Sequence, residues 1–195
     1  PFPVVVYFTA YNGMSYENFG LFESLAQKGF LVVSISSIGR FPGDMTMKYE
    51  DLMEQVDDAV VALKEVKKYP NADSSKIGLM GYSWGGLAAC AFAGKTKTAQ
   101  CIVSLDGSEF HHYTAAKDEN LDFDSIIHTP LFNNMHLSMP YLRLESSPLD
   151  AAAVGKDSVF NFAEKLSVPM LVYKIDSAQH EDFGCMSMVV PRAGN

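Results

Sequence analysis

The residues best suited to chemistry are a serine and its glycine neighbours in the run 81–86 (GYSWGG). A G-x-S-x-G motif exposes a nucleophilic hydroxyl when it forms a sharp turn between a strand and a helix. The run 76–80 (KIGLM) predicts that strand, and the small-residue run 87–93 predicts that helix. Glycines are needed around such a turn because it leaves no room for side chains. We therefore predict that Ser83 is a nucleophile and that the backbone N–H of Trp84 faces the developing oxyanion.

A serine hydroxyl reacts only when a base takes its proton and an acid orients that base. Strand–turn–helix serine motifs keep the chain order serine, acid, histidine. His180 follows the predicted strand 169–175 and is the expected base, the alternative being a surface histidine beside acidic residues. The remaining histidines precede this strand and are expected at the surface or lining a pocket: His111, His112, His128 and His136.

Two aspartates compete for the role of the acid. Asp106 comes directly after the predicted strand 101–105, and Asp150 comes shortly after the predicted strand 139–145. Asp106 is favoured because it stands at a strand end, although Asp-Gly is also a common turn pair. Asp176 and Asp182 are too near His180 along the chain to reach its ring comfortably.

A second oxyanion donor is expected from the loop after the first predicted strand, in the run FTAYNGMS. The backbone N–H of Tyr11 is the preferred candidate, with Ala10 and Asn12 as neighbouring alternatives. No metal or organic cofactor is expected. His111 and His112, beside Asp106 and Glu109, could suggest a metal site, but adjacent side chains on a strand or helix point apart, which disfavours one.

The rest of the chain alternates apolar strands with helices. Continuous apolar runs are typical of strands that are buried on both faces, so we predict an α/β fold: a mostly parallel sheet of about six strands with helices on both faces. The predicted strands are 3–9, 30–35, 76–80, 101–105, 139–145 and 169–175, and the predicted helices are 16–28, 44–69, 87–93 and 157–166. Residues 107–138 show no clear period, so we predict one domain, 1–195, with 107–139 as a lid or insertion.

Composition narrows the classes of function. The 195 residues suffice for one core, and 48% are apolar and 19% charged, as in ordinary globular proteins. A net charge of −8 argues against nucleic acid and anionic lipid surfaces as partners. No apolar run approaches the roughly 20 residues of a membrane helix, which predicts a soluble protein, either cytoplasmic or exported after removal of a leader. The chain begins at Pro1, so we expect a processed product or a fragment.

The motifs GYSWGG, LDGS at 105–108 and H-x-x-F at 180–183 resemble the α/β-hydrolase superfamily. They are most like platelet-activating-factor acetylhydrolase-like and dienelactone-hydrolase-like serine esterases. The acetylhydrolase branch also places its acid directly after the strand that follows the serine helix, which supports Asp106. Dienelactone hydrolases proper use a cysteine nucleophile, so their lactone chemistry is not implied for Ser83. The resemblance also implies a trimmed version of the fold, without the first strands and the last helix.

These observations predict a serine esterase that cleaves a small-molecule carboxylic ester through an acyl-enzyme on Ser83. The expected catalytic residues are Ser83, Asp106 and His180, with Trp84 and Tyr11 at the oxyanion. A peptidase or amidase with the same residues, or a binding protein without catalysis, are the alternatives. An apolar acyl pocket could be lined by aromatic residues, which could equally be plain core: Phe110, Tyr113, Phe123, Phe132 and Tyr141.

Overall fold

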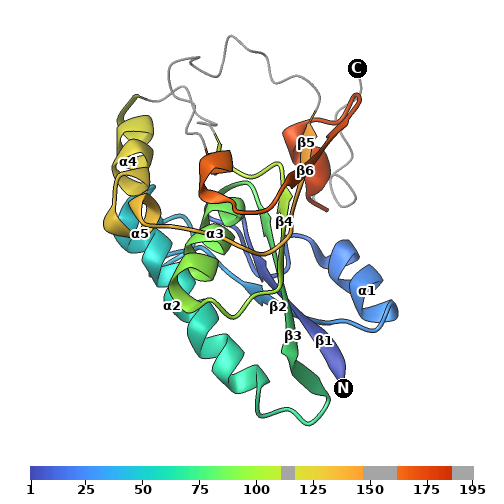
Figure 1. Ribbon diagram of the computed structural model, residues 1–195. Coiled ribbons are helices and arrows are strands. Elements are labelled where there is room, and N and C mark those ends of the chain that lie inside the picture. The colour runs from blue at the N-terminus through green and yellow to red at the C-terminus, as the bar shows by residue number, and fades with distance from the viewer. Residues whose placement is uncertain (111–116, 147–161, 186–195) are drawn as a thin grey trace, which may run out of the picture.

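The structure is a computed structural model that describes residues 1–110, 117–146 and 162–185. Six parallel strands form one sheet in the order β2-β1-β3-β4-β5-β6 (Figure 1). The strands are β1 (Phe2–Phe8), β2 (Leu31–Ile35), β3 (Ala72–Tyr82), β4 (Cys101–Leu105), β5 (Tyr141–Ser146) and β6 (Met170–Ile175). The predicted parallel α/β sheet is therefore confirmed.

Helices cover both faces of the sheet. Helix α1 (Phe19–Gln27) lies on one face, and α2 (Tyr49–Val66) and α3 (Trp84–Thr96) lie on the other (Figure 1). Helix α2 is amphipathic and buries residues at helical spacing, whereas α3 buries every residue from Trp84 to Ala93. Because α3 is built of small residues, it packs closely at the centre of the molecule, directly behind the end of β3.

The part of the chain after β4 differs from the prediction. Residues 117–133 are not irregular but form α4 (Lys117–Ile127) and α5 (Pro130–Asn133), which pack against α2 and α3. Phe123, Ile126 and Phe132 are buried in the main core, so tertiary packing stabilises helices whose sequence has a weak period. The function of 107–139 as a lid stays a prediction, and residues 111–116 lie outside the described part.

Smaller differences concern element ends. Helix α2 begins at Tyr49 rather than at residue 44, because Asp51 accepts hydrogen bonds from the backbone N–H and hydroxyl of Thr46 and holds a turn there. Strand β3 begins at Ala72 rather than at residue 76, because its first residues pair with Phe2 and Pro3. Of the predicted helix 157–166, the described part is η2, the single 3₁₀ turn Phe162–Lys165.

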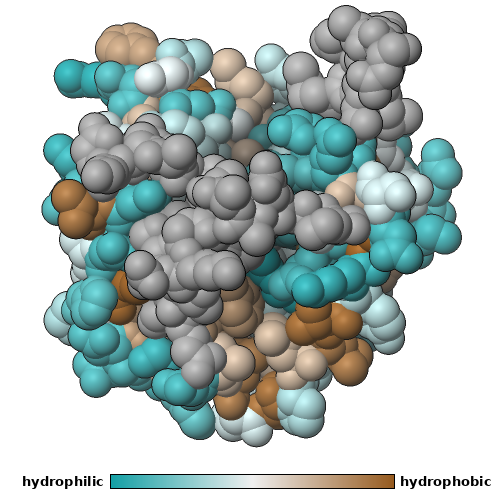
Figure 2. Space-filling view, turned by 90° about the horizontal axis from the view of Figure 1, so that it is seen from above, coloured by the Kyte–Doolittle hydropathy of each residue, from teal (hydrophilic) through white to brown (hydrophobic). Residues whose placement is uncertain are grey.

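The strand order places a site at one edge of the sheet. The chain moves from β1 to β2 in one direction and then returns past β1 to β3, β4, β5 and β6 in the other. In open α/β sheets, the crevice at such a reversal lies at the carboxyl ends of the strands and is the usual place for a ligand. Seen from above this edge, the described surface is mostly hydrophilic, with hydrophobic residues gathered toward one side (Figure 2). Within the described residues, no helix is both long and apolar enough to cross a membrane.

Candidate active site

The turn at Ser83 has the geometry that the glycine motif predicts. Ser83 lies between the last residue of β3 and the first residue of α3, with φ 54° and ψ −122°. A Cβ atom on Gly81 would lie 2.0 Å from the carbonyl oxygen of Gly85, and one on Gly85 would lie 2.0 Å from that of Phe8. Both positions therefore require glycine, because the clashing atoms are backbone and cannot move aside.

Ser83, His180 and Asp106 form a continuous hydrogen-bonded row. The Nε2 atom of His180 lies 2.9 Å from Ser83 Oγ, and its Nδ1 atom lies 2.8 Å from Asp106 Oδ2. The residues lie 97 and 74 positions apart in the chain, respectively. A carboxylate that binds Nδ1–H leaves Nε2 as an acceptor for the serine hydroxyl proton. The arrangement can therefore remove a proton from Ser83.

Asp106 is anchored on its far side by Ser146 at the end of β5. Ser146 donates its backbone N–H to Asp106 Oδ1 at 3.0 Å and its hydroxyl to Oδ2 at 2.8 Å. Burial would raise the pKa of Asp106, but the hydrogen bonds from His180 and Ser146 and the charge of His180 outweigh it, and the pKa lies below its ordinary value. The carboxylate is thus held ionised, with only 1% of the residue exposed.

Two backbone hydrogen bonds join the turn at Ser83 to the end of β4 and the loop that carries Asp106. The N–H of Ser83 donates to the carbonyl of Leu105 at 3.1 Å, and the N–H of Ser108 donates to the carbonyl of Ser83 at 2.9 Å. Asp106 itself has φ 47°, in the left-handed region, so the chain turns sharply at the end of β4. Ser83 and Asp106 are therefore placed by one set of backbone hydrogen bonds.

A buried ion pair joins β5 to the loop that follows β4 and carries Asp106. Arg143 Nη1 lies 2.7 Å from Glu109 Oε1 and donates to the carbonyl of Gly107 at 2.9 Å, and both charged residues are fully buried. The hydroxyl of Tyr141 also donates to Glu109 Oε1. Sequence reasoning considered Glu109 only beside a possible metal site, and it missed the charge pairing because Arg143 lies 34 residues further along the chain, on β5.

Tyr82 holds the loop of His180. Its hydroxyl donates to the carbonyl of His180 at 3.0 Å, and the two rings lie 5.0 Å apart at an angle of 32°. Burial, together with the nearby carboxylate of Glu17, raises the pKa of Tyr82 above its ordinary value, so the hydroxyl stays a donor. Sequence reasoning missed this residue although it stands inside the glycine motif, because a variable position there carries no signal of its own.

The two residues expected at the oxyanion lie side by side. Trp84 is the first residue of α3, and its ring meets the ring of Tyr11 edge-on at 6.2 Å. Tyr11 stands in the turn 10–13, which is closed by the hydrogen bond from Gly13 N–H to the carbonyl of Ala10 at 2.8 Å. The N–H of Ala10 donates to Glu17 at 2.9 Å, so it is already engaged within the protein. The assignment of the Trp84 and Tyr11 N–H groups to an oxyanion stays a prediction.

Four of the other candidate residues fall outside the described part of the chain: Asp150, His111, His112 and Tyr113. His128 binds the carbonyl of Asp124, and His136 binds the hydroxyl of Ser167, both at the exposed surface. The described aromatic candidates belong to the core or pack on it: Phe110, Phe123, Phe132 and Tyr141. In 1–110, 117–146 and 162–185, no group of three His, Cys, Asp or Glu side chains could hold a metal ion.

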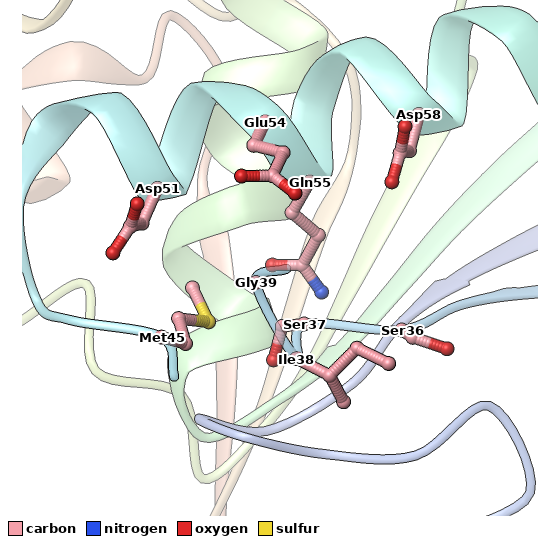
Figure 3. Close-up of a pocket in the computed structure, with 9 residues that line it drawn as sticks. All are labelled: Ser36, Ser37, Ile38, Gly39, Met45, Asp51, Glu54, Gln55 and Asp58. Atoms are coloured by element: carbon pink, nitrogen blue, oxygen red, sulfur yellow. The ribbon is translucent and has the colours of Figure 1, made fainter. Parts of the chain in front are cut away.

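A cavity of about 260 Å³ lies between α2 and the loop 36–39, which contacts the turn 10–13. Figure 3 shows that Asp51, Glu54 and Asp58 lie on the face of α2 that is turned toward the loop 36–39, which follows β2. Ser37 joins this loop to the turn, because it donates its hydroxyl to the carbonyl of Ala10 and its N–H to that of Gly13. Three carboxylates line this cavity, and none of the aromatic residues predicted for an acyl pocket lines it.

Comparisons with known proteins agree with this architecture. The model of the dienelactone hydrolase family matches residues 1–135 of the chain. An α/β hydrolase from Penicillium sp. sh18 superposes with a TM-score of 0.65 at 11% identity, over 97% of this chain and 87% of that one. A dienelactone hydrolase from Anabaena variabilis superposes with a TM-score of 0.59 at 19% identity, over 92% and 76% of the two chains.

A ferulic acid esterase from Streptomyces cinnamoneus has the same fold, with a TM-score of 0.65 at 18% identity, over 100% of this chain and 57% of that one. No curated protein sequence shows a significant match. These identities are low, so the structures show a shared fold, whereas the family model covers more than half of the sequence. The chain therefore belongs to the dienelactone hydrolase family, a family of hydrolases with the α/β-hydrolase fold.

Proposed function

We propose that this hydrolase is a serine esterase that cleaves a small-molecule carboxylic ester through an acyl-enzyme on Ser83. The observation that carries the proposal is the 2.9 Å distance between Ser83 Oγ and His180 Nε2, with Asp106 2.8 Å from the other ring nitrogen. A ferulic acid esterase with the same fold supports an ester as the substrate class.

In the first half of the reaction, His180 Nε2 takes the proton of Ser83 as Oγ attacks the ester carbonyl carbon. The carbonyl oxygen becomes an oxyanion, which the N–H groups of Trp84 and Tyr11 would stabilise. His180 then gives its proton to the leaving alkoxide, and the alcohol departs while the acyl group stays on Ser83. Asp106 keeps Nδ1 protonated and stabilises the imidazolium that forms between the two proton transfers.

In the second half, water attacks the acyl carbonyl carbon and His180 Nε2 takes its proton. The second oxyanion collapses, the bond to Ser83 Oγ breaks, and the same proton returns to the serine. The products are a carboxylic acid and an alcohol, and the enzyme is restored. This route needs no redox step, since each half only forms one bond to the carbonyl carbon and breaks another.

Serine rather than cysteine is the proposed nucleophile. Cys90 and Cys185 are buried, and Cys101 is exposed at the start of β4, the end of the strand opposite Asp106. Burial raises the pKa of the thiols of Cys90 and Cys101, which disfavours the reactive thiolate. The chemistry of a family member with a cysteine nucleophile would therefore need a different residue at position 83.

Labelling with a fluorophosphonate tests the nucleophile. The wild type and Ser24→Ala, a control that removes an exposed serine hydroxyl on α1, should be labelled, whereas Ser83→Ala should not. Turnover of p-nitrophenyl esters against matched p-nitroanilides then separates an esterase from an amidase or peptidase. Equal labelling of Ser83→Ala, or a folded wild type that is not labelled, would overturn the proposal, and the latter would favour a binding protein.

A further inference from the structure

Glu17 lies outside the row Ser83–His180–Asp106 but contacts the turn that carries the expected second oxyanion donor. Its Oε1 atom accepts the backbone N–H of Ala10 at 2.9 Å and the hydroxyl of Tyr7 at 3.1 Å. Its other oxygen lies against Gly13, where an added Cβ atom would be only 2.3 Å away. The carboxylate therefore packs along the turn 10–13 and binds its first residue.

The neighbouring residue, Asn18, binds the loop of His180. Its Nδ2 group donates to the carbonyl of Phe183 at 2.8 Å and to the hydroxyl of Tyr7 at 3.1 Å. Its Oδ1 atom accepts the thiol of Cys185 at 2.9 Å, and the N–H of Cys185 donates to the carbonyl of Glu17 at 3.3 Å. Phe183 ends the 3₁₀ turn that His180 begins. The two sides of the site thus meet at one buried cluster.

We propose that Glu17 and Asn18 are positioning residues: Glu17 holds the turn with the Tyr11 N–H, and Asn18, through Tyr7, joins that turn to the loop of His180. This inference rests on the proposed function. Neither side chain is assigned a contact with substrate. Each acts by holding backbone in place, and a displacement of about 1 Å in such a site can lower the rate by about 100-fold.

The charge of Glu17 gives this role a signature in pH. Burial, and not a like-charged neighbour, is the main cause that raises the pKa of Glu17 from 4.5 to about 7. The titratable groups near it are Tyr7 on β1, Tyr82 at the end of β3 and Cys185. Burial raises the pKa of both tyrosines, so their hydroxyls stay neutral, and the Cys185 thiol donates to Asn18.

The direction of the effect follows from hydrogen bonding. Above about pH 7 the ionised carboxylate accepts the Ala10 N–H and the Tyr7 hydroxyl in charge-assisted hydrogen bonds, and below it the neutral acid holds them more weakly. Glu17→Gln keeps an acceptor oxygen of the same size but cannot ionise. The variant should therefore behave at every pH as the wild type behaves in acid.

The test is the ratio of wild-type to Glu17→Gln kcat on a p-nitrophenyl ester, measured from about pH 5.5 to about pH 8.5. Protonation steps that the two proteins share cancel in this ratio. We expect the ratio to rise from about 1 in acid to about 10 in base, with KM changed less than about threefold. Glu23→Gln, the same change at an exposed position on α1, should give a ratio near 1 throughout.

A second variant keeps the inference falsifiable if the first folds poorly. Asn18→Ala should lower kcat by about 10- to 100-fold at all pH values, without a step near neutrality. A Glu17→Gln ratio that stays at 1, or that falls below 1 in base, would overturn the role of Glu17, provided the wild type turns over ester. A wild type without esterase activity and without labelling at Ser83 would instead overturn the proposed function.

Discussion

Asp106 is one of the two aspartates, with Asp150, that the sequence offers as the acid that orients His180. It is almost completely buried, and it accepts three hydrogen bonds, two from Ser146 and one from His180. A carboxylate in this position needs no other neighbour to stay ionised and to hold the imidazole tautomer. The competing aspartate, Asp150, lies outside the described residues, so a functional test decides between them.

Asp106→Asn should lower kcat by about a thousandfold or more while the fold persists, because an amide can force the wrong imidazole tautomer. Steady-state kinetics on a p-nitrophenyl ester, with circular dichroism to confirm folding, would measure this. Asp176→Asn, an exposed aspartate near the same histidine, should keep its activity. Retained activity in Asp106→Asn together with its loss in Asp150→Asn would transfer the role of the acid to residue 150.

At the scale of elements, the approach of β3, α3 and β1 depends on glycine. Gly85→Ala would place a Cβ atom 2.0 Å from the backbone oxygen of Phe8 and should destabilise the fold by at least about 3 kcal/mol. Gly184→Ala meets no atom closer than the Tyr82 ring at 3.6 Å, an ordinary van der Waals contact, and should change stability by less than about 0.5 kcal/mol. Urea unfolding curves of both variants measure the difference, and equal midpoints would contradict the close packing.

The ion pair between Arg143 on β5 and Glu109 in the loop after β4 permits a second test at this scale. Arg143→Met leaves Glu109 buried without its cation and should cost about 3–5 kcal/mol of unfolding free energy. Adding Glu109→Gln to that variant should recover part of the loss, because the second charge is then removed as well. Lys68→Met breaks an exposed pair with Glu65 and should cost less than about 1 kcal/mol. No recovery in the double variant would indicate that packing, not charge, carries the effect.

At the scale of the whole molecule, the network of Glu17 links stability to pH. The folded state raises the pKa of Glu17 from 4.5 to about 7, so it binds the proton more tightly than the unfolded chain does. The corresponding stability is fully present below about pH 4.5 and is lost as the pH rises through about 7. Asp106 has the opposite sign, since its lowered pKa contributes stability that is lost only on acidification below its ordinary value.

Glu17→Gln should therefore flatten the dependence of stability on pH. Relative to this variant, the wild type should lose on the order of 3 kcal/mol of unfolding free energy between about pH 4.5 and about pH 8. Urea unfolding of both proteins at these two pH values measures the difference, and Glu23→Gln serves as the exposed control. Parallel curves for wild type and Glu17→Gln would show that Glu17 has an ordinary pKa. A variant that is more stable but less active in base would fit a residue kept for positioning.

The whole fold also shows where sequence patterns lose their force. Residues 117–133 have little helical period of their own, yet they form α4 and α5 because α2 and α3 offer an apolar surface to cover. The expectation that 1–195 form one domain remains a proposal. A lid in 107–139 also remains a proposal. If this segment is a lid, the protein should turn over bulky esters slowly, and a deletion within the segment should relieve that limit.

Local chain geometry is what the sequence by itself determined. A serine between glycines, with a strand before it and a helix after it, predicts a sharp turn that exposes the hydroxyl. Residues that follow parallel strands emerge at one edge of the sheet, which made Ser83, Asp106 and His180 the candidates. The tertiary structure alone decided which buried polar groups meet. Asn18 and Phe183 lie 165 residues apart, and hydrogen bonding over that separation depends on the packed arrangement of the whole sheet, which no short pattern encodes.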